Sequence, residues 1–169
     1  MSTATRSRIG FIVVILIIAV IGTSAYLSGS QFLETNAAVT ETLEIQLTLS
    51  DLLTLVVDAE TGGRGFFITG DESYLEPYIA ATENIEARFT RLRSLLTDRQ
   101  SVQRVLILRD LVNRRLRSIE SSIERRRHMT IQEALEANAT PGIGKAQMDE
   151  IRRLVSEMQT VQENLLSER

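Results

Sequence analysis

The sequence of 169 residues contains no cysteine, no tryptophan, one histidine and two prolines. Without cysteine, the chain offers no disulfide, no thiolate nucleophile and no cysteine ligand for zinc or an iron–sulfur cluster. One histidine excludes sites that need two imidazoles from one chain, which removes most haem and di-iron bundle sites. We therefore expect neither an enzyme nor a chain that holds a cofactor or a metal.

The composition favours helices over strands. Aromatic residues make up 5% of the chain, and glycine and proline are scarce. Leucine, isoleucine, valine, alanine, glutamate, arginine and threonine dominate, and the length suits a single domain.

An uncharged, apolar stretch covers residues 9–27. At a rise of about 1.5 Å per residue it is about 28 Å long, close to the ~30 Å hydrocarbon core of a bilayer. Arg6 and Arg8 precede it, so the positive-inside rule places residues 1–8 in the cytoplasm. The sequence predicts a transmembrane helix in the inner (plasma) membrane, with residues 28–169 in the periplasm or extracellular space.

Two alternatives to this anchor exist. Thr23 and Ala25 resemble the small residues of a signal-peptidase site, so the segment could be a cleaved signal peptide. It could also be a buried helix of a soluble core, although no second segment of equal hydrophobicity is present to pack on it. We favour the uncleaved anchor because the helical pattern continues beyond it.

Residues 28–169 show helical periodicity in four segments, with breaks at 69–71, 96–101 and 138–144. Gly70 suits a helix C-cap, Asp71 suits an N-cap, either Asp98 or Ser101 suits the N-cap of the following helix, and Pro77 predicts a kink or a helix start. The apolar stripes are Leu43, Leu47, Leu52, Leu55 and Val56; Ile85, Phe89, Leu92 and Leu96; Val105, Leu108, Val112, Leu116, Ile119 and Ile123; and Ile151, Leu154, Met158, Val161 and Leu165. The predicted fold is all-α: an N-terminal transmembrane helix followed by an antiparallel up-down four-helix bundle.

The topology of such a bundle returns the chain to the membrane. We therefore expect a second transmembrane helix and an output domain beyond residue 169. The alternative is a complete protein with one anchor.

Charge is sorted along the sequence. Residues 28–87 carry eleven acidic residues and one basic residue, residues 88–127 carry twelve basic and four acidic residues, and residues 128–169 carry seven acidic and four basic residues. This pattern favours packing of the acidic first helix beside the basic third helix. In the alternative interpretation the basic helix contacts an anion or a lipid headgroup through Arg114, Arg115, Arg117, Arg125, Arg126 and Arg127. Nucleic acid is not an expected partner of this acidic domain.

Residues 58–78 contain the most distinctive motif. Gly62, Gly63 and Gly65 fall within a helical context, where each costs up to ~1 kcal/mol relative to alanine. They indicate close helix packing or a soft helix, whereas a phosphate-binding loop is disfavoured because the Walker pattern is absent. Glu60 and Arg64 are spaced for an i, i+4 ion pair. Arg64 is the single basic residue among eleven acids, so we expect Arg64→Ala to be more disruptive than Arg126→Ala.

This block resembles the signature of the third type of the CHASE family, the extracellular sensory domains of bacterial histidine kinases, cyclases and chemotaxis-like receptors. Weaker similarity extends to Met148-Asp149-x-Ile151-Arg152 and to Leu165-Leu166…Arg169, while Gly63 stands where the pattern has a polar residue. The signature positions are Asp58, Glu60, Thr61, Gly62, Arg64, Gly65, Thr69, Gly70, Asp71, Tyr74, Leu75, Pro77 and Tyr78. The resemblance implies a four-helix sensory bundle between two membrane helices, with signalling output in the cytoplasm.

The predicted function is that of a signal-input module which relays a small-molecule or protein stimulus through the first and fourth helices. Homodimerisation through apolar residues of the first helix is expected, and the bilayer is the other expected partner. A membrane-anchored stalk or adhesion protein without signalling is the alternative. His128, with Glu124 one turn away, predicts a structural or exposed histidine.

Overall fold

The computed structural model describes the backbone of residues 3–137 and 142–167, and the side chains of residues 16–24, 38–137 and 142–167. The helices are α1 (Thr3–Thr69), the 3₁₀ helix η1 (Glu72–Leu75), α2 (Glu76–Leu95), α3 (Arg99–His128), α4 (Ile131–Glu136) and α5 (Ile143–Ser167). No strand occurs in this part of the chain. The predicted all-α class is confirmed.

The structure divides into two units. The first contains residues 1–40 and the second residues 41–168, and α1 contributes to both. In the first unit, Leu16 and Val20 are 58% and 67% exposed. No helix has a stretch long and apolar enough to cross a membrane among the side chains that the structure describes. The predicted span at 9–27 falls largely outside those side chains, so it stays a prediction.

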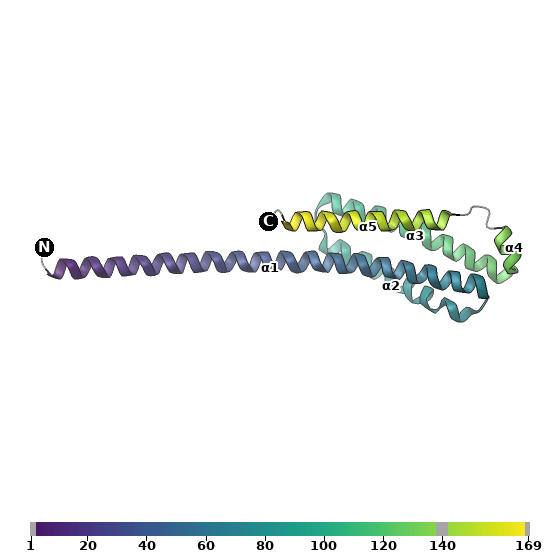
Figure 1. Ribbon diagram of the computed structural model, residues 1–169, viewed down its shortest axis with the longest axis horizontal. Coiled ribbons are helices and arrows are strands. Elements are labelled where there is room, and N and C mark those ends of the chain that lie inside the picture. The colour runs from purple at the N-terminus through teal and green to yellow at the C-terminus, as the bar shows by residue number, and fades with distance from the viewer. Residues whose placement is uncertain (1–2, 138–141, 168–169) are drawn as a thin grey trace. The chain divides into compact units, whose positions relative to one another are not determined.

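The second unit is built around a core shared by its four long helices. Figure 1 shows the chain passing back and forth along α1, α2, α3 and α5 within this unit. Fully buried side chains from each helix meet in the core, including Leu49, Phe89, Leu108 and Ile151. Apolar residues recur every three or four positions on each helix, so each one presents a continuous stripe to its neighbours.

The helix ends follow the local sequence. Gly70 has a φ of +75° and its N–H donates to the carbonyl oxygen of Phe66 at 2.7 Å, closing α1. The Asp98 carboxylate accepts from the N–H of Ser101 at 2.8 Å and caps α3. Pro77 lies in the first turn of α2, where its missing N–H costs nothing. The predicted breaks near 70 and 98 and the helix start at Pro77 are confirmed.

The third break differs from the expectation. α3 already ends at His128, and the short helix α4 follows with a capping box between Thr130 and Glu133. The side chain of each residue accepts a hydrogen bond from the backbone N–H of the other, and this arrangement favours the start of a new helix. Residues 138–141 of the predicted turn lie outside the described residues, while Gly142 has a φ of +93°.

Two predicted stripes are wrong at their ends. Leu43 and Leu47 are 52% and 65% exposed, because Ile45 and Leu49 face the core instead. In α5, Leu165 is 44% exposed and Gln162 is buried. The buried positions of α5 advance with the 3.6-residue period of a straight helix, which drifts away from a strict heptad after two repeats.

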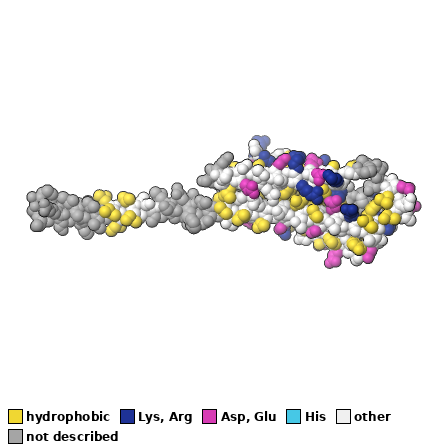
Figure 2. Space-filling view, viewed as in Figure 1, with side chains coloured by type: hydrophobic (Ala, Val, Ile, Leu, Met, Phe, Trp, Pro, Cys, Tyr) yellow, Lys and Arg dark blue, Asp and Glu magenta, His cyan; other side chains and the backbone are white. Residues whose placement is uncertain are grey.

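The charge sorting appears as ion pairs between helices. On α2, Arg88 lies 3.5 Å from Asp51 of α1, and Arg91 pairs with Glu44 of α1. Figure 2 shows basic and acidic side chains next to each other on the visible face of this unit. The expected pairing was between acidic α1 and basic α3, and among the described residues one ion pair, Glu60 with Arg115, joins these two helices, while the two pairs above join α1 to α2. Each exposed pair contributes only ~0–1 kcal/mol, so the pattern selects neighbours more than it stabilises the fold.

Candidate functional site

The glycines of residues 62–65 are sites of close helix packing. A Cβ at Gly62 would lie 2.9 Å from the backbone oxygen of Tyr74, and one at Gly63 would lie 2.5 Å from Cγ2 of Ile119. A Cβ at Gly65 would meet the Tyr74 ring at 2.5 Å. Contact with α2, α3 and η1 therefore offsets the poor helix propensity of these glycines. Of the two interpretations, close packing is confirmed.

The second half of the signature builds the turn between α1 and α2. The hydroxyl of Thr69 donates to the carbonyl of Gly65 at 2.8 Å, and the Asp71 carboxylate accepts from the N–H of Ser73 at 2.9 Å, which lowers the pKa of Asp71. Leu75 is buried at 2% exposure. Leu75 belongs to a second core cluster, against which Tyr78 packs; the cluster comprises Ala59, Phe66, Leu75, Ala81, Ile119 and Ile123. Burial raises the pKa of Tyr78.

The charged residues of the signature do not form the expected pair. Glu60 lies 3.2 Å from Nη2 of Arg115 on α3, not against Arg64. Arg64 is exposed and has no hydrogen bond or ion pair with any described residue, and the same holds for Asp58 and Thr61. The i, i+4 prediction is wrong because Arg115 offers Glu60 a partner in a drier environment, with 10% of the Arg115 side chain exposed.

In the basic cluster of α3, Arg117 is exposed and outside the cavity wall, and the other five arginines form two groups. Arg114 pairs with Asp110, Arg127 pairs with Glu72 of η1, and Arg126 donates to the Phe67 and Met129 carbonyls at 3.0 Å each. These three side chains serve the fold. Arg115 and Arg125 instead line a cavity.

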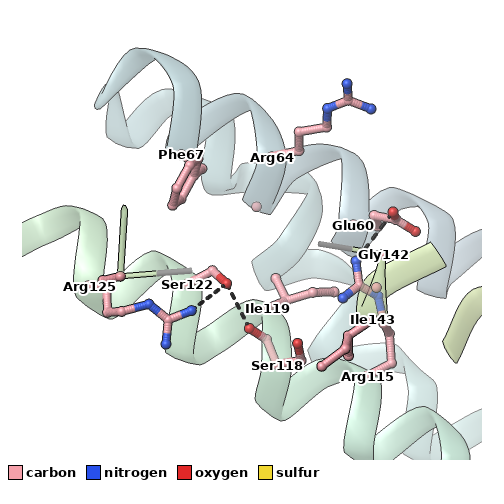
Figure 3. A pocket seen from close by; sticks show the side chains of 13 residues that line it. Glu60, Arg64, Phe67, Arg115, Ser118, Ile119, Ser122, Arg125, Gly142 and Ile143 are labelled. Carbon is pink, nitrogen blue, oxygen red and sulfur yellow. Dashed lines mark hydrogen bonds and ion pairs between the residues drawn. The ribbon is translucent and has the colours of Figure 1, made fainter. Parts of the chain in front are cut away.

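This cavity has a volume of about 470 Å³ and lies between α1, α3 and the beginning of α5. Its walls are Glu60, Gly63, Arg64, Phe67, Arg115, Ser118, Ile119, Ser122, Arg125, Ala137, Gly142, Ile143 and Gly144. In Figure 3, Arg115 extends toward Glu60, and Arg64 points away from both Arg115 and Arg125. The cavity exists because the second core cluster holds no α5 residue, and the first buried α5 side chain is Met148.

The two arginines in the cavity wall are incompletely satisfied. The Nε atoms of Arg115 and Arg125 are buried and have no hydrogen-bond partner among the described residues. Arg125 donates from Nη1 to the Ser121 hydroxyl at 2.7 Å and from Nη2 to the Ser122 hydroxyl at 3.1 Å, and it pairs with no carboxylate of a described residue. The sequence carries no signal for Ser118, Ser122 or Ile143 at this site, because only the tertiary packing of α1, α3 and α5 brings them together.

His128 lies outside the cavity. Its Nε2 is 2.8 Å from Glu124 on the exposed side of α3, as the spacing predicted. The hydrogen bond with His128 lowers the pKa of Glu124. No cluster of three or more potential metal ligands occurs among the described side chains.

Comparisons with known proteins agree with this architecture. The CHASE3 domain family model matches residues 35–169. The crystal structure of the sensor domain of the Rhodopseudomonas palustris histidine kinase HK9 is similar over 74% of this chain and 98% of that chain, with a TM-score of 0.62 and 27% identity. A search of curated proteins gave no match.

Proposed function

The chain belongs to the CHASE3 domain family and is a sensory input module of a receptor, and we propose that it passes its signal on through α1 and α5. In this proposal the chain performs no catalysis of its own. An attached domain, such as a histidine kinase or a cyclase, provides the output.

One contact supports this route more than any other. Nε2 of Gln46 on α1 donates to Oε1 of Glu163 on α5 at 3.0 Å. These residues lie near the two points where the chain enters and leaves the second unit. A nearby second bond joins Gln159 to Ser50 at 3.3 Å. In this proposal the connections to other parts of a receptor begin at this end, so a small sliding or rotation of α5 against α1 would be transmitted there.

The opposite end of the unit supplies a means of moving these helices. Arg115 pairs with Glu60 of α1, and a Cβ at Gly144 of α5 would lie 3.0 Å from its guanidinium. One buried side chain on α3 therefore contacts both helices of the proposed route. A stimulus that displaces Arg115 changes the packing of α1 and α5 together.

The setting of the module is part of the proposal. Residues 9–27 would anchor it in the inner (plasma) membrane, with residues 1–8 in the cytoplasm and the second unit in the periplasm or extracellular space. The exposure of Leu16 and Val20 supports an apolar environment for this helix. A homodimer would form through the exposed Leu43 and Leu47 of α1.

Cross-linking tests the route directly. The chain would be fused to the cytoplasmic part of a histidine kinase, and a short bismaleimide would join Gln46→Cys to Glu163→Cys. The native chain has no cysteine, so both thiols are unique. We expect autophosphorylation to change at least threefold after cross-linking, because the relative motion of α1 and α5 is blocked.

The matched control joins Glu86→Cys of α2 to Arg109→Cys of α3, an exposed pair 2.7 Å apart. This cross-link is expected to leave autophosphorylation within 1.5-fold of the untreated fusion. Equal changes from both cross-links, or no change from either, would contradict a route through α1 and α5.

A further inference from the structure

The cavity between α1, α3 and the start of α5 combines concentrated positive charge with an apolar wall. Arg64, Arg115 and Arg125 line it, and Glu60 is the single acidic residue in the wall. Because Arg64 points away from the other two arginines, the inner part of the wall holds Arg115 and Arg125 against Glu60, an excess of one positive charge. Of these two inner arginines, Arg125 has only serine hydroxyls as partners among the described residues. A cleft lined by an excess of positive charge attracts an anion.

The two inner arginines are also incompletely hydrogen-bonded, which is an observation independent of the charge: their Nε atoms are buried and have no partner among the described residues. A buried N–H without a partner costs free energy, and native proteins leave few of them. Here two occur on the arginines that line the cavity, Arg115, which is 8% exposed, and Arg125. The guanidinium group is suited to carboxylates, because its planar N–H donors can form two parallel hydrogen bonds with two oxygens.

The rest of the wall restricts the ligand further. Phe67, Ile119 and Ile143 contribute apolar surface, and Ser118 and Ser122 contribute hydroxyls. The volume of about 470 Å³ lies in the range of small-molecule sites. An inorganic anion would leave most of this space and all of the apolar wall unused.

We infer that this cavity binds a small organic carboxylate with an apolar body, whose carboxylate contacts Arg115 and Arg125 and whose body lies against Phe67 and Ile119. The inference rests on the proposed function and specifies the stimulus class of the same module. Because Arg115 also contacts Glu60 and Gly144, the carboxylate would compete with Glu60 for the guanidinium. Binding would then alter the contacts of α3 with α1 and α5.

Calorimetric titration of the full 169-residue chain in a non-ionic detergent tests the inference. The probes are sodium benzoate and sodium hexanoate, with benzyl alcohol as the uncharged analogue of benzoate and inorganic phosphate as an anion without an apolar body. We expect saturable binding of at least one carboxylate, and binding at least tenfold weaker for benzyl alcohol and for phosphate.

Variants locate the binding. Arg125→Gln is expected to weaken carboxylate binding at least tenfold, because it removes a charged donor that bonds only to serines of its own helix. Ser118→Leu fills the cavity while keeping both charges and should also weaken binding tenfold. Arg114→Gln removes the same charge from the exposed face of α3, where Arg114 pairs with Asp110, and should stay within twofold of the native chain.

Three results would overturn the inference: no saturable binding of either carboxylate up to 10 mM, equal weakening by Arg125→Gln and Arg114→Gln, or phosphate binding as tight as benzoate binding. None of them affects the cross-linking test of α1 and α5, which uses no ligand. The proposal of carboxylate binding and the proposal of a signal route through α1 and α5 can therefore be contradicted independently of each other.

Discussion

Glu60 of α1 forms an ion pair with Arg115 of α3 at 3.2 Å, although Arg64 lies four residues further along the same helix. The pair joins two helices at the wall of the cavity, and its arginine side chain is 10% exposed while its glutamate side chain is 32% exposed. A buried charge is costly when its partner is removed, so this contact restricts how α1 and α3 can pack.

Glu60→Gln is expected to lower the free energy of unfolding by about 1–2 kcal/mol, measured by urea denaturation. The value lies below that of a fully buried pair because solvent reaches Glu60. Asp51→Asn is the control, since its pair with Arg88 is exposed and its loss should cost less than about 1 kcal/mol. Equal decreases in the free energy of unfolding for Glu60→Gln and Asp51→Asn would contradict the claim that the ion pair of Glu60 stabilises the fold more than an exposed pair does.

Arg126→Ala is expected to destabilise the fold by about 1–3 kcal/mol, and Arg64→Ala by less than about 0.5 kcal/mol. Arg126 bonds to the carbonyls of Phe67 and Met129 and covers Gly70, whereas Arg64 is exposed. This order reverses the sequence-based expectation for folding, which rested on the isolation of Arg64 among acids. Thermal unfolding of both variants checks this prediction. A larger drop in Tm for Arg64→Ala than for Arg126→Ala would contradict it and support the expectation from the sequence.

Gly62→Ala is expected to destabilise the fold by about 1–3 kcal/mol, even though alanine favours the helix by about 1 kcal/mol. The new Cβ would lie 2.9 Å from the Tyr74 oxygen and 3.0 Å from the Tyr78 nitrogen, and backbone atoms cannot rotate away. Gly22→Ala is the matched control on the same helix, because nothing lies within 4 Å of its Cβ position. Circular dichroism during heating should show a lower Tm for Gly62→Ala alone.

Acid should weaken the cap of α3. The hydrogen bonds from Ser101 lower the pKa of Asp98 in the folded chain, so the cap contributes stability above the unfolded pKa of about 3.9. This contribution is lost as the pH falls through the folded pKa. Asp98→Asn keeps an acceptor without titrating, so its Tm should fall less than that of the native chain between pH 6 and pH 3.

The control for the acid experiment is Asp58→Asn. The Asp58 carboxylate is exposed and has no hydrogen bond or ion pair with a described residue. This variant should keep the pH dependence of the native chain. The same reduced dependence in both variants would show that Asp98 is not the responsible group.

Single cysteines on α1 test the homodimer. Leu43→Cys and Leu47→Cys should cross-link to their symmetry mates in membranes under mild oxidation, because both side chains are exposed apolar positions. Ile79→Cys on α2, also about half exposed, should stay monomeric. A monomeric pattern at every position of α1 would remove the dimer from the proposal.

Local sequence determined the helices and several of their ends. Gly70 can adopt a positive φ, Asp98 can accept from N–H groups, and Pro77 fits a first helical turn, and each effect depends on a few neighbouring residues. Helical periodicity also identified most of the core, including Phe89 and Ile151. The family signature at residues 58–78 was equally visible in the sequence.

Only the tertiary structure decided which partner each of several side chains meets. Glu60 bonds to Arg115 rather than Arg64, and Gln162 rather than Leu165 faces the core, because the relative rotation and spacing of packed helices set these choices. The cavity arises in the same way: α5 adds no residue to the second core cluster beside α1 and α3. Helix periodicity specifies which face of a helix is apolar, but the space between helices depends on how all of them pack together.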